Sequence, residues 1–426
     1  MRLELFKYTF YFVVTAIFFG QLGAYAEETM GLEDNDVVEV NLFTGEGVSL
    51  GGVLFPHIHA SGVTGVSTAG EISRLANGHH DPQTDVTLQT LEVGASLRLG
   101  DYVEGFGVYS AYTDADGDMD GELEEAFLKL VKLPGGFELR GGRILNRFGF
   151  QAGTHNHSWD FVNQTLMNGR LLHEGELATD GGEVTWHVPT PFRSALSFSV
   201  GEVRSHDHDH EHTHTQDAEF DAEGAWFSDT FFTLNYLAQW DYNDFHQNRL
   251  TLSAAWGDNV FDRSTQVYGV GYEYQWRENG YEAGGTYFRL RNELVYRRFG
   301  AVSDEHTHDA HHAHEHHEQD EHDEHHEHHE HDIVRKSLDD LGFYSSAHYG
   351  FNEHVEAGVR VGYVSSVAEA GLDERWRVSP NMTYSLNAQR TLYARIQYDF
   401  DYSSEFGDDH SVWFQIGFNW GTSEVR

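Results

Sequence analysis

The sequence predicts an all-β fold, a transmembrane antiparallel β-barrel of about 16 strands with long extracellular loops and no plug domain. Three observations support this prediction. Many segments alternate apolar and polar residues with a period of two, several reach the roughly 9–11 residues that a tilted strand needs to cross a bilayer, and their connections alternate between short and long. Strands of soluble proteins are usually only about 5–6 residues long, so the three features together favour a membrane barrel over a soluble sandwich.

The alternation is clearest in residues 391–402, TLYARIQYDFDY. Ile396 belongs to an apolar set at the even-numbered positions, and Arg395 belongs to a polar set between them. Segments 267–277 and 354–364 repeat the pattern. Because successive side chains of a strand point to opposite faces, each segment has one face suited to lipid and one suited to a polar interior.

The alternating segments follow one another along the whole chain. Sixteen strands are expected, at 46–57, 86–99, 102–113, 122–133, 137–148, 181–189, 192–204, 229–240, 246–256, 264–277, 280–298, 337–350, 353–366, 373–386, 389–403 and 410–420. Short turns follow the even-numbered strands up to the fourteenth, and most other connections are long. Bacterial outer-membrane barrels have short periplasmic turns and long extracellular loops, so the outer membrane is the expected location and its lipid an expected partner.

The N-terminus has the features of a secretory signal peptide over residues 1–26. A positively charged start precedes an apolar run of about a dozen residues, too short to span a bilayer as a helix, and AYA at Ala24–Ala26 is a small-x-small cleavage site. We then expect a short periplasmic segment at 27–45, the barrel at 46–420 and a C-terminal extension at 421–426. The aromatic-ended final strand resembles the signal that barrel assembly machinery recognises, which makes that machinery an expected partner.

Composition narrows the classes of function. The formal net charge is -42, which excludes nucleic acid as a partner because phosphate binding needs a basic surface, and which favours cations. The chain has no cysteine, so thiolate metal sites are excluded. We expect a protein that is not an enzyme.

Two histidine-rich runs fall in connections of the same parity, 205–228 and 299–336, so both are predicted to face outside the cell. The residues predicted to bind metal there are His206, His208, His210, His212, His214, His306, His308, His311, His312, His314, His316, His317, His322, His325, His326, His328, His329 and His331. Twelve acidic residues and no Lys or Arg accompany the second run, between Asp304 and Asp332. Imidazole with nearby carboxylates suits divalent transition metals, chiefly zinc, while Ni, Cu and Co remain open by ligand type.

The runs also admit plainer interpretations. A solvated acidic loop without function needs only carboxylates, and it leaves the histidine enrichment unexplained. In the 205–217 run the histidines occupy every second position, so an extended strand would place them on one face, where neighbours can share a metal. A disordered loop would make that spacing incidental, and the sequence leaves both interpretations open.

A third long connection, at 149–180, is predicted to fold into the barrel, as the corresponding loop commonly does in sixteen-stranded porins. It contains His155, His157 and Asp160, an H-x-H-x-x-D set of ligand type that would bind metal at a constriction. The alternative is that these histidines pack with Trp159 in an ordered loop. The first long loop is expected to add His57, His59, His79 and His80 to the outer face.

Residues 124–162 carry EEAF, LPGG and HNHSWDFV, and an acidic lead-in, DADGDMDGEL, precedes them. This pattern resembles a family of Gram-negative outer-membrane barrels often described as zinc-regulated outer-membrane receptors. The resemblance covers about residues 120–190 and implies an outer-membrane location and a role in zinc acquisition. That family is sometimes described as TonB-dependent, which requires a plug domain. Segment 27–45 is too short for a plug, so a passive, porin-like channel is expected.

These observations lead to a channel or receptor that captures divalent metal, chiefly zinc, and passes it to the periplasm, where a zinc-binding protein would collect it. One alternative is a surface zinc-binding or buffering protein anchored by the barrel. Another is a general or anion-preferring porin, because several arginines, among them Arg140 and Arg395, are predicted to face the interior. A homotrimer is also open, since many porins are trimers.

Overall fold

The computed structural model describes residues 38–45, 48–68, 81–82, 86–114, 117–172, 175–204, 219–220, 222–282, 285–303 and 334–421. The expected signal peptide and C-terminal extension after Gly421 lie outside these ranges. So do His79, His80 and every histidine of the two histidine-rich runs.

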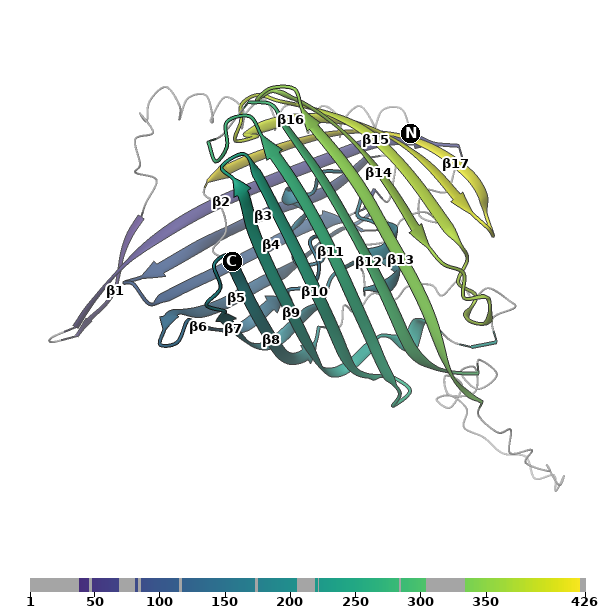
Figure 1. Cartoon of the computed structure of the whole chain (residues 1–426), viewed down its shortest axis with the longest axis horizontal. Helices are drawn as coiled ribbons and strands as arrows, with labels where there is room; N and C mark the ends of the chain where they lie inside the picture. The colour runs from purple at the N-terminus through teal and green to yellow at the C-terminus, as the bar shows by residue number, and fades with distance from the viewer. Residues whose placement is uncertain are drawn as a thin grey trace, which may run out of the picture.

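The described residues form seventeen strands, and sixteen of them close into an antiparallel barrel (Figure 1). The strands are β1 (Val38–Gly45), β2 (Val48–Ser67), β3 (Val86–Leu99), β4 (Val103–Thr113), β5 (Met119–Leu133), β6 (Phe137–Leu145), β7 (Ala178–His187), β8 (Arg193–Val203), β9 (Phe227–Asn243), β10 (His246–Asn259), β11 (Ser264–Arg277), β12 (Tyr287–Val302), β13 (Arg335–Gly350), β14 (Val355–Val364), β15 (Arg375–Ser385), β16 (Leu392–Ser403) and β17 (Gly407–Gly421). From β2 onward each strand pairs with the next, and β17 pairs with β2. β1 pairs only with the first part of β2.

The sixteen predicted segments correspond in order to β2 through β17, which confirms the predicted barrel. The largest difference is β2, which continues to Ser67 although the sequence predicts its end at residue 57. Pro56 is tolerated because it lies just beyond the pairing of β2 with β17, which ends at His57. The placement of His57 and His59 in an outer loop is therefore wrong, because both belong to the barrel wall.

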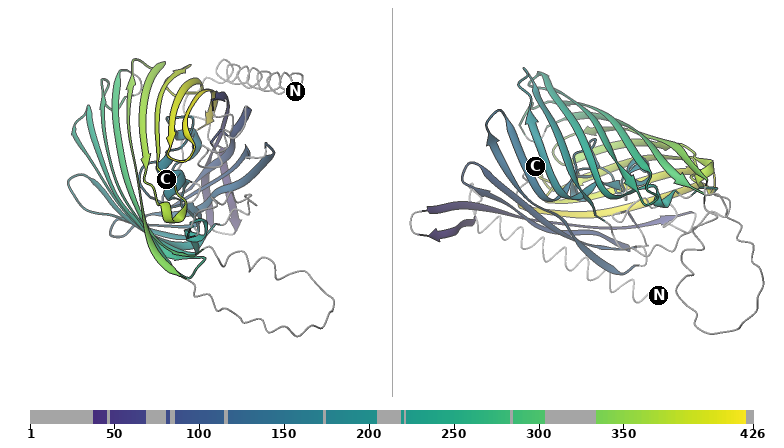
Figure 2. Two further views of the ribbon diagram at one scale, coloured as in Figure 1. Left: turned by 90° about the vertical axis from the view of Figure 1, so that its right-hand side faces the viewer. Right: turned by 90° about the horizontal axis from the view of Figure 1, so that it is seen from below.

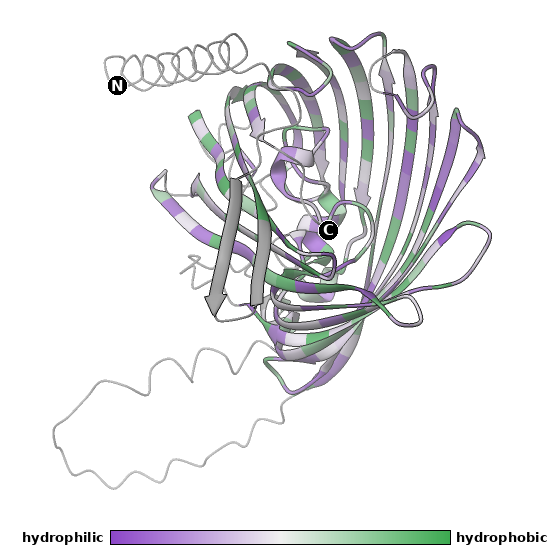
Figure 3. Ribbon diagram, turned by 90° about the vertical axis from the view of Figure 1, so that its left-hand side faces the viewer, coloured by the Kyte–Doolittle hydropathy of each residue, from purple (hydrophilic) through white to green (hydrophobic). Residues whose placement is uncertain are grey.

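The two faces of the wall differ as the alternation predicts. On β16, Ile396 is 53% exposed on the outer face, while the neighbouring Gln397 is 1% exposed on the inner face. Figure 3 shows hydrophobic and hydrophilic residues alternating along the strands. An apolar outer surface on a closed wall that satisfies its own backbone hydrogen bonds is suited to lipid. Among the described residues no helix is long and apolar enough to cross a membrane.

Both histidine-rich runs connect strands at the same end of the barrel. One run lies between β8 and β9 and the other between β12 and β13. Phe220, which follows the first run, forms an antiparallel bridge with Ser303, which precedes the second. The chain therefore brings one end of each run to the same point on the rim.

The barrel encloses the segment between β6 and β7, residues 146–177, which we call the inner loop. The two views in Figure 2 show the wall curving around it. The inner loop contains a short 3-10 helix, η2 (Asn156–Ser158), and one helix, α2 (Leu166–Leu171). Its apolar side chains, including Met167, form a buried core with residues of the wall such as Val295. Part of the barrel interior is thus filled by packed side chains.

Candidate metal centre inside the barrel

The inner loop approaches the wall closely because facing residues are small. Phe148 and Phe150 pack over Gly269 and Gly271 of β11, where a side chain at either glycine would collide with the rings. Between them Gly149 adopts a φ of +61°, and a Cβ there would lie 2.0 Å from a carboxylate oxygen of Glu293. The backbone N–H of Phe150 donates to that carboxylate at 2.8 Å. This end of the loop is therefore fixed to β11 and β12.

The middle of the inner loop is bonded to strands on several sides of the barrel. Val162 donates its N–H to Gln397 of β16 at 2.8 Å and accepts from Gln89 of β3 at 2.6 Å. Asn163 accepts from Arg360 of β14 through its backbone carbonyl at 2.8 Å. Because β3 lies on the opposite side of the wall from β11 and β12, the loop crosses the interior and is held from both sides.

Where the inner loop meets β2, β3 and β5, imidazoles and carboxylates gather in what we call the histidine–glutamate cluster: His59, Glu92, Glu124, Glu125, His155 and His157. Nδ1 of His155 contacts Oε2 of Glu124, and its Nε2 lies 3.1 Å from Oε2 of Glu125. Nδ1 of His157 lies 2.5 Å from Oε2 of Glu92. The rings of His155 and His157 are stacked with centroids 5.8 Å apart.

A β-bulge aims two successive carboxylates of β5 into the barrel. In the pairing with β4, Val108 is opposite Glu125 and Tyr109 is opposite Leu123, so Glu124 is an extra residue. Regular alternation would send Glu124 and Glu125 to opposite faces, but both are buried, at 3% and 0% exposure. Bulges commonly redirect side chains next to functional sites.

Three members of the cluster have the spacing of a metal site. One ligand atom from each of Glu92, Glu124 and His155 lies within 4.8 Å of the others, and all three residues are buried. Imidazole nitrogen with carboxylate oxygen is a donor set that zinc accepts, at about 2.0–2.2 Å per ligand. A small shift of these side chains toward a shared centre would therefore produce coordination distances.

His59 borders the cluster from β2, with its ring centroid 5.4 Å from that of His157. Its Nδ1 lies 2.5 Å from Oδ1 of Asn419. Nδ2 of Asn419 donates to the carbonyl of Arg390 at 2.9 Å, which fixes the amide so that its oxygen faces the imidazole. His59 therefore carries its proton on Nδ1, and its Nε2 is a buried lone pair with no hydrogen-bond partner among the described residues. Metal-bound histidines have this arrangement, with the other ring nitrogen donating to an oxygen.

Charge in the cluster is unevenly balanced. Glu125 has a guanidinium partner, Arg140, at 3.8 Å. Glu92 and Glu124 lie against imidazoles, those of His157 and His155 respectively. Burying carboxylates costs several kcal/mol per charge unless a cation or hydrogen bonds compensate them. A divalent cation would neutralise both Glu92 and Glu124.

On the opposite side of the inner loop, Asp160 faces the arginine side, which we define as Arg249, Arg289, Arg291 and Arg390 with the carboxylates Glu273 and Glu356. Oδ1 of Asp160 lies 2.5 Å from Nη2 of Arg289, and Oδ2 lies 3.7 Å from Nη1 of Arg291. Burial alone would raise the pKa of Asp160, but the arginines and His348 outweigh it and hold that pKa well below its usual range.

The remaining carboxylates of the arginine side are paired as well. Arg291 binds Glu273 at 2.6 Å, and Arg390 reaches both oxygens of Glu356 at 2.5 and 2.6 Å. Arg249 and Arg390 also keep 38% and 29% of their side-chain surface exposed. Here guanidinium groups balance the carboxylates without an added ion, and part of the positive charge faces the open interior.

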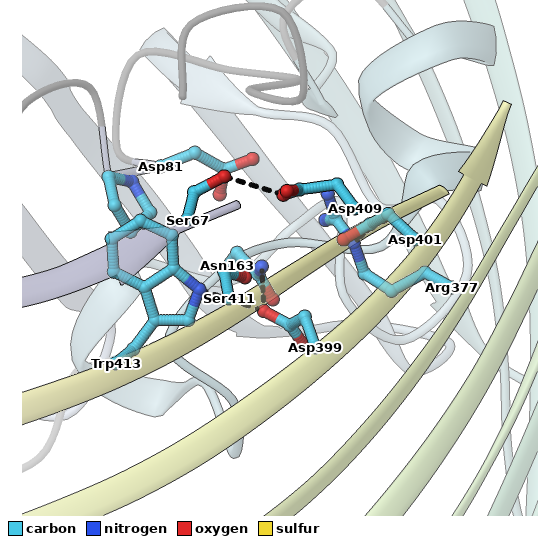
Figure 4. A pocket seen from close by; sticks show the side chains of 10 residues that line it. Ser67, Asp81, Asn163, Arg377, Asp399, Asp401, Asp409, Ser411 and Trp413 are labelled. Carbon is cyan, nitrogen blue, oxygen red and sulfur yellow. Dashed lines mark hydrogen bonds and ion pairs between the residues drawn. The ribbon is translucent and has the colours of Figure 1, made fainter. Parts of the chain in front are cut away.

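A polar cavity lies near the outer ends of β2, β16 and β17 (Figure 4). It is lined by Ser67, Asp81, Pro82, Asn163, Arg377, Asp399, Asp401, Asp409, Ser411 and Trp413. Its carboxylates have protein partners: Asp401 accepts from Arg377 at 2.6 Å, and Asp409 accepts from the Ser67 hydroxyl at 2.7 Å. Asp81 also accepts from the backbone N–H of Gln164 at 2.8 Å, so residues that line this cavity help to hold the inner loop.

The structure brings together two of the three inner-loop residues predicted from sequence. His155 and His157 lie in the cluster, whereas Asp160 contacts the arginine side instead. The wall residues Glu92, Glu124 and His59 were not among the candidate ligands predicted from sequence. The HIH of β2 and the consecutive glutamates of EEAF, which break the alternation of β5, are the signals that could have found two of them.

Comparison with known proteins supports the fold and leaves the family open. No family model matches the chain. An uncharacterised protein of Aquifex aeolicus (strain VF5) is 36% identical over 78 residues, a match that spans 18% of this chain and only 16% of that protein. An anion-selective porin from Comamonas acidovorans has a TM-score of 0.53 at 8% identity, covering 87% of this chain and 100% of that structure.

Salmonella typhi OmpF, in a structure described as a complex with daunomycin, has a TM-score of 0.50 at 12% identity, covering 90% of this chain and all of that one (100%). The fold is that of a porin-like outer-membrane β-barrel. With its closed wall and apolar outer face, the chain is a protein of the outer membrane.

Proposed function

We propose that this porin-like barrel is a non-enzymatic channel and receptor for divalent metal, chiefly zinc. The two histidine-rich runs capture the ion at the outer mouth, and the ion then passes through the barrel interior to the periplasm. A periplasmic zinc-binding protein would collect it there. The resemblance of residues 124–162 to zinc-regulated outer-membrane receptors supports the choice of zinc.

One observation carries this proposal. The bridge between Phe220 and Ser303 joins the chain just after the first histidine-rich run to the chain just before the second. The backbone N–H of Phe220 also donates to the carbonyl of Glu369, in the connection between β14 and β15, at 2.9 Å. Both runs are thereby tethered at one point of the rim, where they would raise the local metal concentration at a single entrance.

Planar-bilayer recording of the purified full-length protein tests the proposal. The protein should conduct, zinc added on the loop side should alter the current, and a variant lacking 305–332 should lose most of that response. A barrel that never conducts would refute the channel. If the deletion abolished zinc retention without changing permeability, the surface-buffering alternative would be correct.

A general or anion-preferring porin is a second candidate, favoured by the partly exposed guanidinium groups of Arg249 and Arg390 inside the barrel. The solved structure from Comamonas acidovorans is named an anion-selective porin. Reversal potentials in a salt gradient decide between the two, because clear anion selectivity would contradict a metal channel. The homotrimer stays a prediction, which mass determination in detergent would test.

A further inference from the structure

The contacts of the inner loop point to a second role for metal in this barrel. The histidine–glutamate cluster joins the loop to β2, β3 and β5, and its core residues are almost fully enclosed: Glu92 is 0% exposed, while Glu124 and His155 are each 3% exposed. An ion on a path through the channel needs contact with water on both sides. An ion at this cluster would be enclosed by protein and would exchange slowly.

We infer that Glu92, Glu124 and His155 bind one resident divalent transition-metal ion, with Nε2 of His59 as fourth ligand, and that this ion fastens the inner loop to the wall. The ion is a structural component rather than cargo, so the inference goes beyond the proposed channel function. It depends on that function only for the choice of zinc as the first metal to test.

Three observations carry the assignment independently. The ligand atoms of Glu92, Glu124 and His155 already lie within 4.8 Å of one another. The buried Nε2 of His59, a residue 2% exposed, has its lone pair free because the amide of Asn419 fixes the proton on Nδ1. The combined charge of the two carboxylates, Glu92 and Glu124, matches that of one divalent ion.

The donor set selects the class of metal. One or two imidazoles with two carboxylates suit zinc and its first-row neighbours. Calcium and magnesium prefer shells of oxygen ligands, so His155 and His59 would be unnecessary for them. His157 would then be a positioning residue, because its ring nitrogen binds Glu92 at 2.5 Å and orients that carboxylate.

The test uses full-length protein purified from outer membranes and loaded with Zn²⁺ alone. Dialysis against a chelator of moderate strength strips the exchangeable ions of the histidine-rich runs, and the zinc remaining per chain is then measured by mass spectrometry. Wild type should retain about one zinc per chain. Glu92→Gln combined with Glu124→Gln should retain none, with zinc affinity at the site falling more than about 100-fold.

Glu293→Gln is the matched control, because Glu293 is a buried carboxylate that also contacts the inner loop but lies outside the cluster. It should retain the zinc. His155→Gln changes only the loop, so it provides the same test should the wall variant fail to assemble. Equal zinc retention in wild type and the cluster variants would overturn the assignment, as would a wild type that retains none. These outcomes are independent of whether the channel conducts or the histidine-rich runs capture metal.

Discussion

The inner loop contacts the barrel wall on two sides, and different groups lie against the carboxylates on each side. On the arginine side, Asp160 lies against Arg289, and Glu273 and Glu356 are matched by further guanidinium groups. In the histidine–glutamate cluster, Glu92 and Glu124 face imidazoles. An arginine remains charged at every physiological pH, whereas an imidazole near neutrality needs a proton or a metal to balance a carboxylate. On the proposed assignment, the arginine side is complete as the chain folds, and a bound cation completes the histidine–glutamate cluster.

The largest effect on opening of the inner loop should come from removing an ion pair of the arginine side. Asp160→Ala would leave Arg289, whose side chain is 18% exposed, without its carboxylate; breaking a fully buried pair costs about 3–5 kcal/mol, and we expect about 3 kcal/mol here. Opening of the inner loop should then become on the order of a hundredfold more frequent. Hydrogen–deuterium exchange of residues 154–163 measures the frequency of this opening.

Asp180→Ala is the control for that variant. Asp180 also pairs with an arginine, Arg143, but its side chain is 54% exposed, and exposed pairs contribute about 0–1 kcal/mol. If Asp160→Ala changed exchange no more than Asp180→Ala does, the arginine side would not be holding the loop.

A smaller effect, on zinc affinity, is expected from substitution of His157, the positioning residue of the histidine–glutamate cluster. His157→Ala removes the hydrogen bond that orients Glu92, and loss of such a partner typically lowers metal affinity about 10–100-fold. Competition with a chelator of known zinc affinity measures the change. His348→Ala is a suitable control, because His348 is a buried histidine that packs against Phe161 outside the cluster. Equal losses in the two variants would indicate general loosening of the loop rather than a role for His157.

The two sides should also differ in their response to pH. The pKa of Asp160 is held well below its usual range by Arg289, Arg291 and Arg390, together with His348. A carboxylate with a depressed pKa stabilises the fold fully above its unfolded pKa of about 3.9, and this contribution is lost only as pH falls through the lower folded value. The difference in loop exchange between wild type and Asp160→Asn should therefore be constant from pH 7 to 5. A difference that shrank steadily across this range would show that the pair is weaker than its geometry indicates.

Deletion in the histidine-rich runs is expected to leave the occupancy of the buried ion unchanged. Deleting 305–332 removes thirteen histidines, so rapidly exchanging zinc should fall, while the chelator-resistant ion should stay at one per chain. Metal content before and after chelator dialysis separates the two pools. Loss of the resistant pool on deletion would place that ion in the runs instead.

The barrel itself was predictable because its determinants are local. A strand with one face toward lipid and one toward the interior must alternate, and the alternation of residues 391–402 survives unchanged in the exposure of β16. The end of β2 was missed because Pro56, two histidines and small residues suggest a loop. Only the register with β17 shows that Pro56 lies just past the last paired residue.

The candidate site was predictable only in part. The HNH spacing indicated His155 and His157, but their partners come from distant strands. Glu124 faces inward only because β5 contains a bulge, which period-two reasoning does not predict. Asp160, three residues after His157, turns toward Arg289 because η2 ends and the chain redirects between them. Spacing along a sequence therefore indicated the donors of the loop, and long-range pairing determined which of them meet.

Anomalous diffraction at the zinc absorption edge, from crystals of the full-length protein grown after chelator dialysis, tests the central claim most directly. The account predicts one strong peak enclosed by Glu92, Glu124 and His155, with density continuous to Nε2 of His59. The inner loop would keep its contacts with the arginine side. An ordered inner loop with no peak among these residues would contradict the account.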